Sequence, residues 1–169
     1  MTAVGQVKRA VAAAIKAAGC AAIESYSEEQ LKRYATAVAA VGTKETVIEE
    51  SGAIEYLGET VDEMTQEMVA VYGRKMLLTL LIEVYAPRTM GAAGCEEAAE
   101  AITQAMMTAL PEGLKLGSLQ WGKTGWDKTT GMFRLDASAK YAAYFVAEAA
   151  EDETVFTDFV LKGTVKERE

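Results

Sequence analysis

The segment that most constrains the fold lies between residues 72 and 110. Its centre, residues 76–85, reads Met-Leu-Leu-Thr-Leu-Leu-Ile-Glu-Val-Tyr, and apolar side chains occupy both parities of this extended run. A strand with one face in water alternates apolar and polar residues, so the pattern predicts a central strand that is covered on both faces. Helices or a neighbouring subunit must supply that cover. Nothing in the segment resembles a reaction centre.

Composition limits the possible classes of function. The chain has 169 residues, enough for one domain (1–169) whose hydrophobic core is stable without disulfide bonds or metal ions. Hydrophobic residues make up 50% of the chain. That apolar content favours a chain that hides part of its surface in an oligomer. The net charge of −8 disfavours specific binding to nucleic acid, since clustered Lys and Arg supply most of that affinity.

The chain contains no histidine, which removes the commonest general base and the commonest zinc ligand. The two cysteines, Cys20 and Cys95, lie far apart in the sequence. We interpret them as free thiols, although spacing alone leaves a disulfide between them open. We therefore expect no enzyme activity, no cofactor and no metal.

Several groups of residues have side chains that could serve as sites of chemistry. Cys95 near a helix N-terminus could be reactive, but a small buried residue is the favoured interpretation. The acidic run Glu151, Asp152 and Glu153 could hold a metal ion, but an acidic hairpin tip that keeps a sheet edge soluble is favoured. A stacking platform for single strands is disfavoured by the net charge; its members would be Trp121, Trp126 and Tyr141 with Lys123, Lys128 and Lys140.

Two main helices are predicted, besides a short helical turn that a capping box at Ser27-Glu28-Glu29-Gln30 opens. Apolar residues at helical spacing indicate a first helix from Val4 to Ala18 that ends near Gly19. The basic and then apolar start of this segment resembles a secretory signal, but Lys16 interrupts the apolar run, so an amphipathic helix is favoured. The second helix is expected over residues 95–110, with two glutamates in its first turn. No segment is long and apolar enough to predict a membrane span.

The remaining elements are predicted strands. We expect a hairpin from strands 34–41 and 45–50 around a turn at 42–44, a loop over 51–65, and a strand over 66–85 in which Gly73 marks a bulge or bend. A strand over 114–122 follows. Residues 132–148 alternate strictly, which predicts a long antiparallel strand that returns over 155–165. The fold class is therefore α+β: two main helices on a mixed, mainly antiparallel sheet with a long C-terminal β-hairpin.

Short motifs along nearly the whole chain point to one family. They are Tyr56-Leu57-Gly58, Tyr72-Gly73-Arg74, Tyr85-Ala86-Pro87-Arg88 followed by Gly91 and Gly94-Cys95-Glu96, then Leu119-Gln-Trp-Gly and Trp126-Asp127-Lys-Thr-Thr-Gly131-Met-Phe. With these motifs and its order of elements, the chain resembles the tail terminator (tail completion, head-tail joining) proteins of long-tailed bacteriophages and of prophages in Gram-positive bacteria.

The resemblance implies a structural protein, not an enzyme, that forms a homo-oligomeric ring, hexameric in that family. Such a ring caps the tail tube, terminates its polymerisation and joins the tail to the head. The implied partners are other copies of the chain, the tail tube protein and a head-side connector protein, with no membrane. DNA would pass through the ring without specific binding. The implied location is the virion tail, assembled in the cytoplasm of the host bacterium.

The expected subunit and partner contacts are Tyr56, Tyr72, Arg74, Arg88, Glu151, Asp152 and Glu153. Two alternatives stay open. One is a phage neck or head completion protein of similar fold. The other is a small α+β enzyme or ligand-binding protein with a pocket under the sheet.

Overall fold

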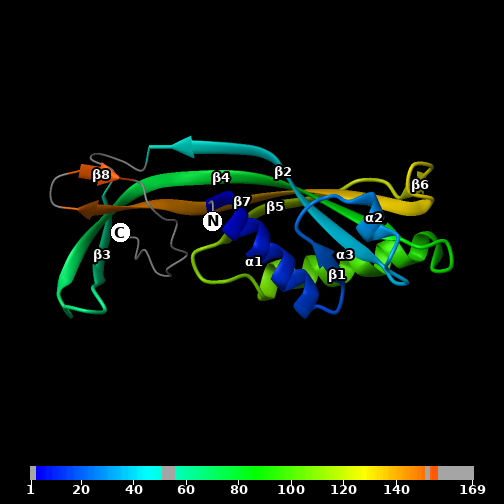
Figure 1. Ribbon diagram of the computed structural model, residues 1–169, viewed down its shortest axis with the longest axis horizontal. Coiled ribbons are helices and arrows are strands. Elements are labelled where there is room, and N and C mark those ends of the chain that lie inside the picture. The colour runs from blue at the N-terminus through cyan, green and yellow to red at the C-terminus, as the bar shows by residue number, and fades with distance from the viewer. Residues whose placement is uncertain (1–2, 51–55, 151–152, 156–169) are drawn as a thin grey trace.

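A computed structural model describes residues 3–50, 56–150 and 153–155 of the chain. A long curved sheet runs the length of the molecule, and the helices cover only part of it (Figure 1). The central strands are β2 (Val38–Glu49), β4 (Met68–Ala86) and β7 (Met132–Ala150), between β1 (Ala21–Ile23) at one edge and β5 (Lys115–Trp121) at the other. At about 3.3 Å per residue, β4 and β7 are each roughly 60 Å long.

Three short strands extend this sheet. β3 (Tyr56–Val61) pairs with the start of β4, while β6 (Gly125–Asp127) and β8 (Glu153–Val155) pair with the two ends of β7. The β1–β2 pair is parallel and the other pairs are antiparallel. The predicted α+β class with a mixed, mainly antiparallel sheet is confirmed. The C-terminal hairpin begins as predicted with β7 and β8, and the expected return strand beyond residue 155 lies outside the described residues.

Helices α1 (Ala3–Ala17) and α3 (Gly91–Thr108) cover one face of the sheet (Figure 1). The apolar stripe predicted for the first helix is buried at Val7, Val11 and Ile15. The stripe packs against β1, β2 and α3, and α3 packs in turn on β4 and β7. Together they form the main core, which includes Leu80 and Ile82. The two main helices of the prediction are therefore confirmed.

The opposite face of β4 is covered only in part within one chain, and cover by a neighbouring subunit stays a prediction. A second small cluster forms where Ile23, Leu31 and Val38 pack around Tyr85, close to the short helix α2 (Glu28–Leu31). The hydroxyl of Ser27 caps α2 by accepting from the backbone N–H of Gln30. Farther along the same face, the side chains of Leu77 and Leu81 are only half-buried.

Two predictions about the first half of the chain are wrong. The hairpin expected around residues 42–44 does not form, because β2 continues through this stretch with a register shift between Thr43 and Glu45. A bulge absorbs the turn-like residues without ending the strand. The loop expected over 51–65 is also wrong for its described part, since β3 pairs with β4 in a hairpin that turns at Asp62.

Gly73 does not mark a bulge in β4, whose register with β7 is continuous from Tyr72 to Ala86. The glycine instead permits a close approach. A Cβ at this position would overlap the backbone carbonyl of Phe145 and lie 2.9 Å from the side chain of Leu57. Gly73 is therefore needed for the packing of three neighbouring strands.

The second helix begins four residues earlier than predicted, at Gly91, so its first turn holds no acidic residue. Glu96 and Glu97 lie in the second turn. Cys95 is consequently not at the helix N-terminus, where the helix dipole would lower its pKa.

Candidate subunit interface

The sheet continues well beyond the helices, and we name this part the distal sheet: residues 43–49 of β2, all of β3 and residues 68–75 of β4 (Figure 1). It exposes a group of large apolar side chains together with the turn that joins β3 to β4. Among them, Met64 is 95% exposed and Met68 is 62% exposed. The others are Val47, Ile48, Tyr56, Val61 and Val69. The strand register places Ile48, Tyr56, Val61 and Met68 on one face of the extension and Val47 and Val69 on the other. Single exposed apolar residues are ordinary, but several on one face are typical of a protein interaction surface.

The distal sheet also has an open strand edge. β1 pairs with β2 only at Val38, Ala39 and Ala40. Among the described strands, none pairs with the outer edge of β2 beyond that point. An edge of this kind offers backbone N–H and C=O groups to a strand of another chain.

Three of the predicted contact residues come together in this region. Tyr56 and Tyr72 are register partners on β3 and β4, and their rings meet edge to face with centroids 5.8 Å apart. Arg74 follows two residues later on the same face of β4, opposite Phe145 of β7. The exposed ring of Tyr56 and the half-buried side chains of Tyr72 and Arg74 therefore belong to one surface.

Arg88 lies at the other end of the molecule, just after β4 ends. Twelve strand positions separate Arg74 from Ala86, roughly 40 Å at the usual rise per residue. The exposed Arg88 side chain lines a shallow depression of about 410 Å³ with Trp126 and Phe133. The two rings meet edge to face at 5.0 Å. Arg74 and Arg88 thus belong to two separate surfaces.

The acidic run is described only in part. Glu151 and Asp152 lie outside the described residues. Glu153 is the first residue of β8, where its backbone is opposite Ala150 of β7.

The aromatic platform that was weighed and disfavoured does not form. The indole N–H of Trp121 donates to the hydroxyl of Thr103 at 2.9 Å, beside α3. Tyr141 is buried in the core, where its hydroxyl lies 3.0 Å from the sulfur of Met106 and burial raises its pKa. Of these three aromatic residues, Trp126 alone is exposed, and its ring packs against Phe133 and not against Trp121 or Tyr141.

A network of charged groups on the face opposite the helices was missed by sequence reasoning. Glu83 of β4 lies directly opposite Asp136 of β7, and Arg134 bridges the two carboxylates. Its guanidinium lies 2.6 Å from Glu83 and makes a bidentate contact with Asp136 at 2.7 and 2.9 Å. The hydroxyl of Tyr85 donates to Glu83 at 3.3 Å, and Arg134 lies over the Tyr85 ring.

The electrostatics of this network follow from burial. Desolvation raises the pKa of Glu83, and the positive charge of Arg134 opposes that rise. The pKa of Tyr85 is also raised, first by burial and then by the charge of Glu83. The signal in the sequence was a glutamate inside an apolar strand, with Arg134 and Asp136 on one face of the strand that pairs with it. Because every group in the network has a partner, we interpret it as structural.

Both cysteines are free and buried, as predicted. The thiol of Cys95 contacts the backbone carbonyls of Val84 and Phe133 at 3.7 and 3.4 Å. Burial raises its pKa to about 11, and burial likewise raises the pKa of Cys20. Neither thiol is positioned as a nucleophile at neutral pH.

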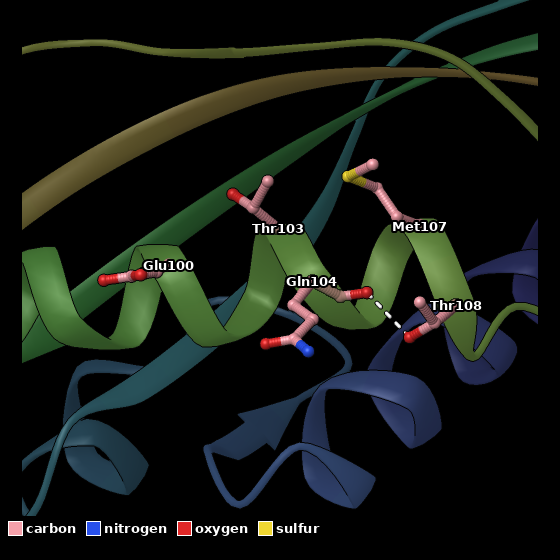
Figure 2. A pocket seen from close by; sticks show the side chains of 5 residues that line it. All are labelled: Glu100, Thr103, Gln104, Met107 and Thr108. Carbon is pink, nitrogen blue, oxygen red and sulfur yellow. Dashed lines mark hydrogen bonds between the residues drawn. The ribbon is translucent and has the colours of Figure 1, made fainter.

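The outer face of α3 carries a second shallow depression, of about 340 Å³ (Figure 2). Its lining residues are Glu100, Thr103, Gln104, Met107 and Thr108. The hydroxyls of Thr103 and Thr108 donate to backbone carbonyls one turn earlier in the helix, both at 2.8 Å. The side chains fan outward in Figure 2 and do not converge on a common point.

Within the described ranges, no three His, Cys, Asp or Glu side chains are arranged to hold a metal ion. The described helices are also too short or too polar to cross a bilayer. No protein-family model matches the chain, and no curated protein matches it.

Proposed function

We propose that this chain is a structural subunit of a bacteriophage or prophage tail, a tail terminator that assembles with copies of itself into a ring, most simply a hexamer. The ring caps the tail tube, ends its polymerisation and presents a surface to the head-side connector. It acts by assembly and not by catalysis. Assembly takes place in the cytoplasm of the host bacterium, and the ring remains in the virion tail.

The observation that carries the proposal is the distal sheet. A monomer gains no core stability from a sheet that extends past its helices with exposed valine, isoleucine and methionine side chains. In a ring, a neighbouring copy can cover these side chains. The open edge of β2 can also continue a sheet into that neighbour.

The charge of the chain supports the same role. A net charge of −8 suits a ring whose channel must let DNA pass without holding it. Among ring-forming structural proteins, the motifs that resemble those of the tail terminator family favour a tail terminator. Two of them, Tyr56-Leu57-Gly58 and Tyr72-Gly73-Arg74, meet on the distal sheet.

The experiment is a tube-growth assay with a phage tail tube protein. Purified chain is added to tube protein during polymerisation, and tube lengths are measured by negative-stain electron microscopy. The proposal predicts shorter tubes with a ring at one end. Tubes of unchanged length without end-bound density would refute the tail terminator role.

The same preparation tests the alternatives. A neck or head completion protein would bind DNA-filled heads and not tube ends, so co-sedimentation with each particle separates the two roles. A small enzyme or ligand-binding protein would bind neither particle.

A further inference from the structure

The hairpin turn of the distal sheet is acidic and rich in methionine, and we name residues 59–68 the acidic tip. The tip contains Glu59, Asp62, Glu63 and Glu67 but no Lys or Arg. Asp62 orders the turn by accepting from the backbone N–H groups of Met64 and Thr65 at 2.8 and 2.9 Å. This turn holds Met64 at the tip, where it is the most exposed large apolar side chain described.

The opposite end of the molecule has complementary chemistry, and we name Arg88, residues 122–130 and Phe133 the basic end. Lys123 and Lys128 flank Trp126 in the sequence. Trp126 is 46% exposed and lines the depression with Arg88 and Phe133. Asp127 is the only acidic residue in the segment 122–130. Its carboxylate accepts from the backbone N–H of Thr129 and the hydroxyl of Thr130.

We propose that the acidic tip of one copy docks into the basic end of the next copy. Met64 enters the depression against Trp126, while Glu59 and Glu67 face the cations of the basic end. This inference rests on the self-association proposed above and names the contact that produces it.

The shape of the chain requires this contact to be intermolecular. The acidic tip precedes β4 and Arg88 follows it, so the two surfaces lie at opposite ends of a strand roughly 60 Å long (Figure 1). A chain cannot bring its own tip to its own basic end. A contact between two different surfaces is heterologous, and repeating it gives a closed ring when the rotation from copy to copy closes on itself.

The chemistry of the two surfaces determines how the contact works. A methionine sulfur against an aromatic ring is favourable, and the flexible side chain fits an open depression without a pre-shaped pocket. Opposite charges around this anchor favour the correct orientation and make association weaker at high salt.

A charge-swap experiment tests the contact, read by analytical ultracentrifugation of the full chain. The first variant, Glu59→Lys/Glu67→Lys, leaves the tip with no net charge, because Asp62 and Glu63 remain. The second variant, Lys123→Glu/Lys128→Glu, has an acidic end. Each variant alone should associate at least about tenfold more weakly than wild type, because the first loses the attraction between its two surfaces and the second has two acidic surfaces that repel. An equimolar mixture should associate again, because the unchanged acidic tip of the second variant then meets the unchanged basic end of the first variant.

Matched controls separate this contact from general effects of charge and hydrophobicity. Glu24→Lys/Glu100→Lys makes the same change in net charge outside both surfaces and should associate like wild type. Met64→Ser should weaken association, whereas Met107→Ser, at an exposed methionine of α3, should not. Circular dichroism confirms that each variant is folded.

The outcomes distinguish this contact from the proposed function. Variants that still form the wild-type oligomer, or a mixture that fails to recover, would overturn the tip-to-end contact and leave the ring proposal standing. Recovery in the mixture together with no capping of tubes by wild type would support the contact and refute the tail role. A wild-type chain that stays monomeric at every concentration overturns the contact.

Discussion

Replacing Arg134 by methionine tests whether the charged network of Glu83, Arg134 and Asp136, on the sheet face opposite the helices, stabilises the fold. Breaking a buried ion pair costs about 3–5 kcal/mol, whereas an exposed pair contributes about 0–1 kcal/mol. The Glu83 side chain is 12% exposed and the Arg134 side chain 37%, so the network lies between these limits. We expect Arg134→Met to lower the free energy of unfolding by about 2 kcal/mol at neutral pH.

The effect should depend on pH with a defined sign. The folded-state pKa of Glu83 is raised, so its carboxyl contributes stability below its unfolded pKa that is lost as the pH rises through the folded value. Arg134 stabilises the ionised carboxylate of Glu83, so it reduces the stability that is lost when Glu83 ionises. The Arg134→Met variant lacks this stabilising charge. The destabilisation should therefore be largest at neutral pH and should shrink toward pH of about 4, where Glu83 is protonated.

The assay is urea unfolding followed by circular dichroism at a fixed protein concentration, since oligomers unfold in a concentration-dependent way. With an m value of about 2 kcal/mol/M, the expected loss lowers the urea midpoint by about 1 M. Glu83→Gln in the Arg134→Met background should recover part of the loss, because it removes the unpaired buried charge. A midpoint that is unchanged at both pH values would refute the role assigned to this network.

Three further predictions follow from packing and thiol burial. Gly73→Ala should lower the free energy of unfolding by about 2 kcal/mol or more. The control Gly42→Ala should change the free energy of unfolding little, because its new Cβ would meet nothing closer than 3.8 Å. Equal urea midpoints for the two variants would contradict the close approach at Gly73. Ile102→Ala should cost about 2–5 kcal/mol in the same assay, with the exposed Met107→Ala as control, and a small loss at Ile102 would contradict the assigned core. The Cys95 thiol, with a pKa of about 11, should resist iodoacetamide at pH 8 until urea unfolds the chain; rapid alkylation of folded protein in a mass-spectrometric assay would contradict its burial.

Strong periodicity explains the part of the fold that could be predicted from sequence. The alternation over residues 132–148 gave the long β7, and the apolar stripe at Val7, Val11 and Ile15 gave α1. These patterns extend over many residues, so a few exceptions do not hide them.

The errors came from short local signals that tertiary pairing overrode. Gly42, Thr43 and Lys44 have the composition of a turn, but pairing with β4 on both sides of them keeps β2 extended through a bulge. Gly73 also resembled a bulge residue, and its contact with Phe145 depends on a strand more than seventy residues later.

The candidate interface was foreseen in part. Tyr56, Tyr72 and Arg74 belong to two short motifs that the sequence shows. That they lie on one surface follows from the register between β3 and β4, which the sequence does not show. The pairing of Trp126 with Phe133 beside Arg88 depends on the β6–β7 hairpin and the end of β4, which no local pattern specified. The exposure of Met64 could not be predicted either, because composition does not tell which apolar residues lie outside the core.

Native mass spectrometry of the purified chain, alone and with tail tube protein, tests the central claim most directly. The distal sheet and its open edge predict one discrete closed oligomer, most simply a hexamer, that persists as the protein is diluted. A strictly monomeric chain under both conditions, or an open-ended series of masses without a preferred size, would contradict the assembly of this protein into a ring.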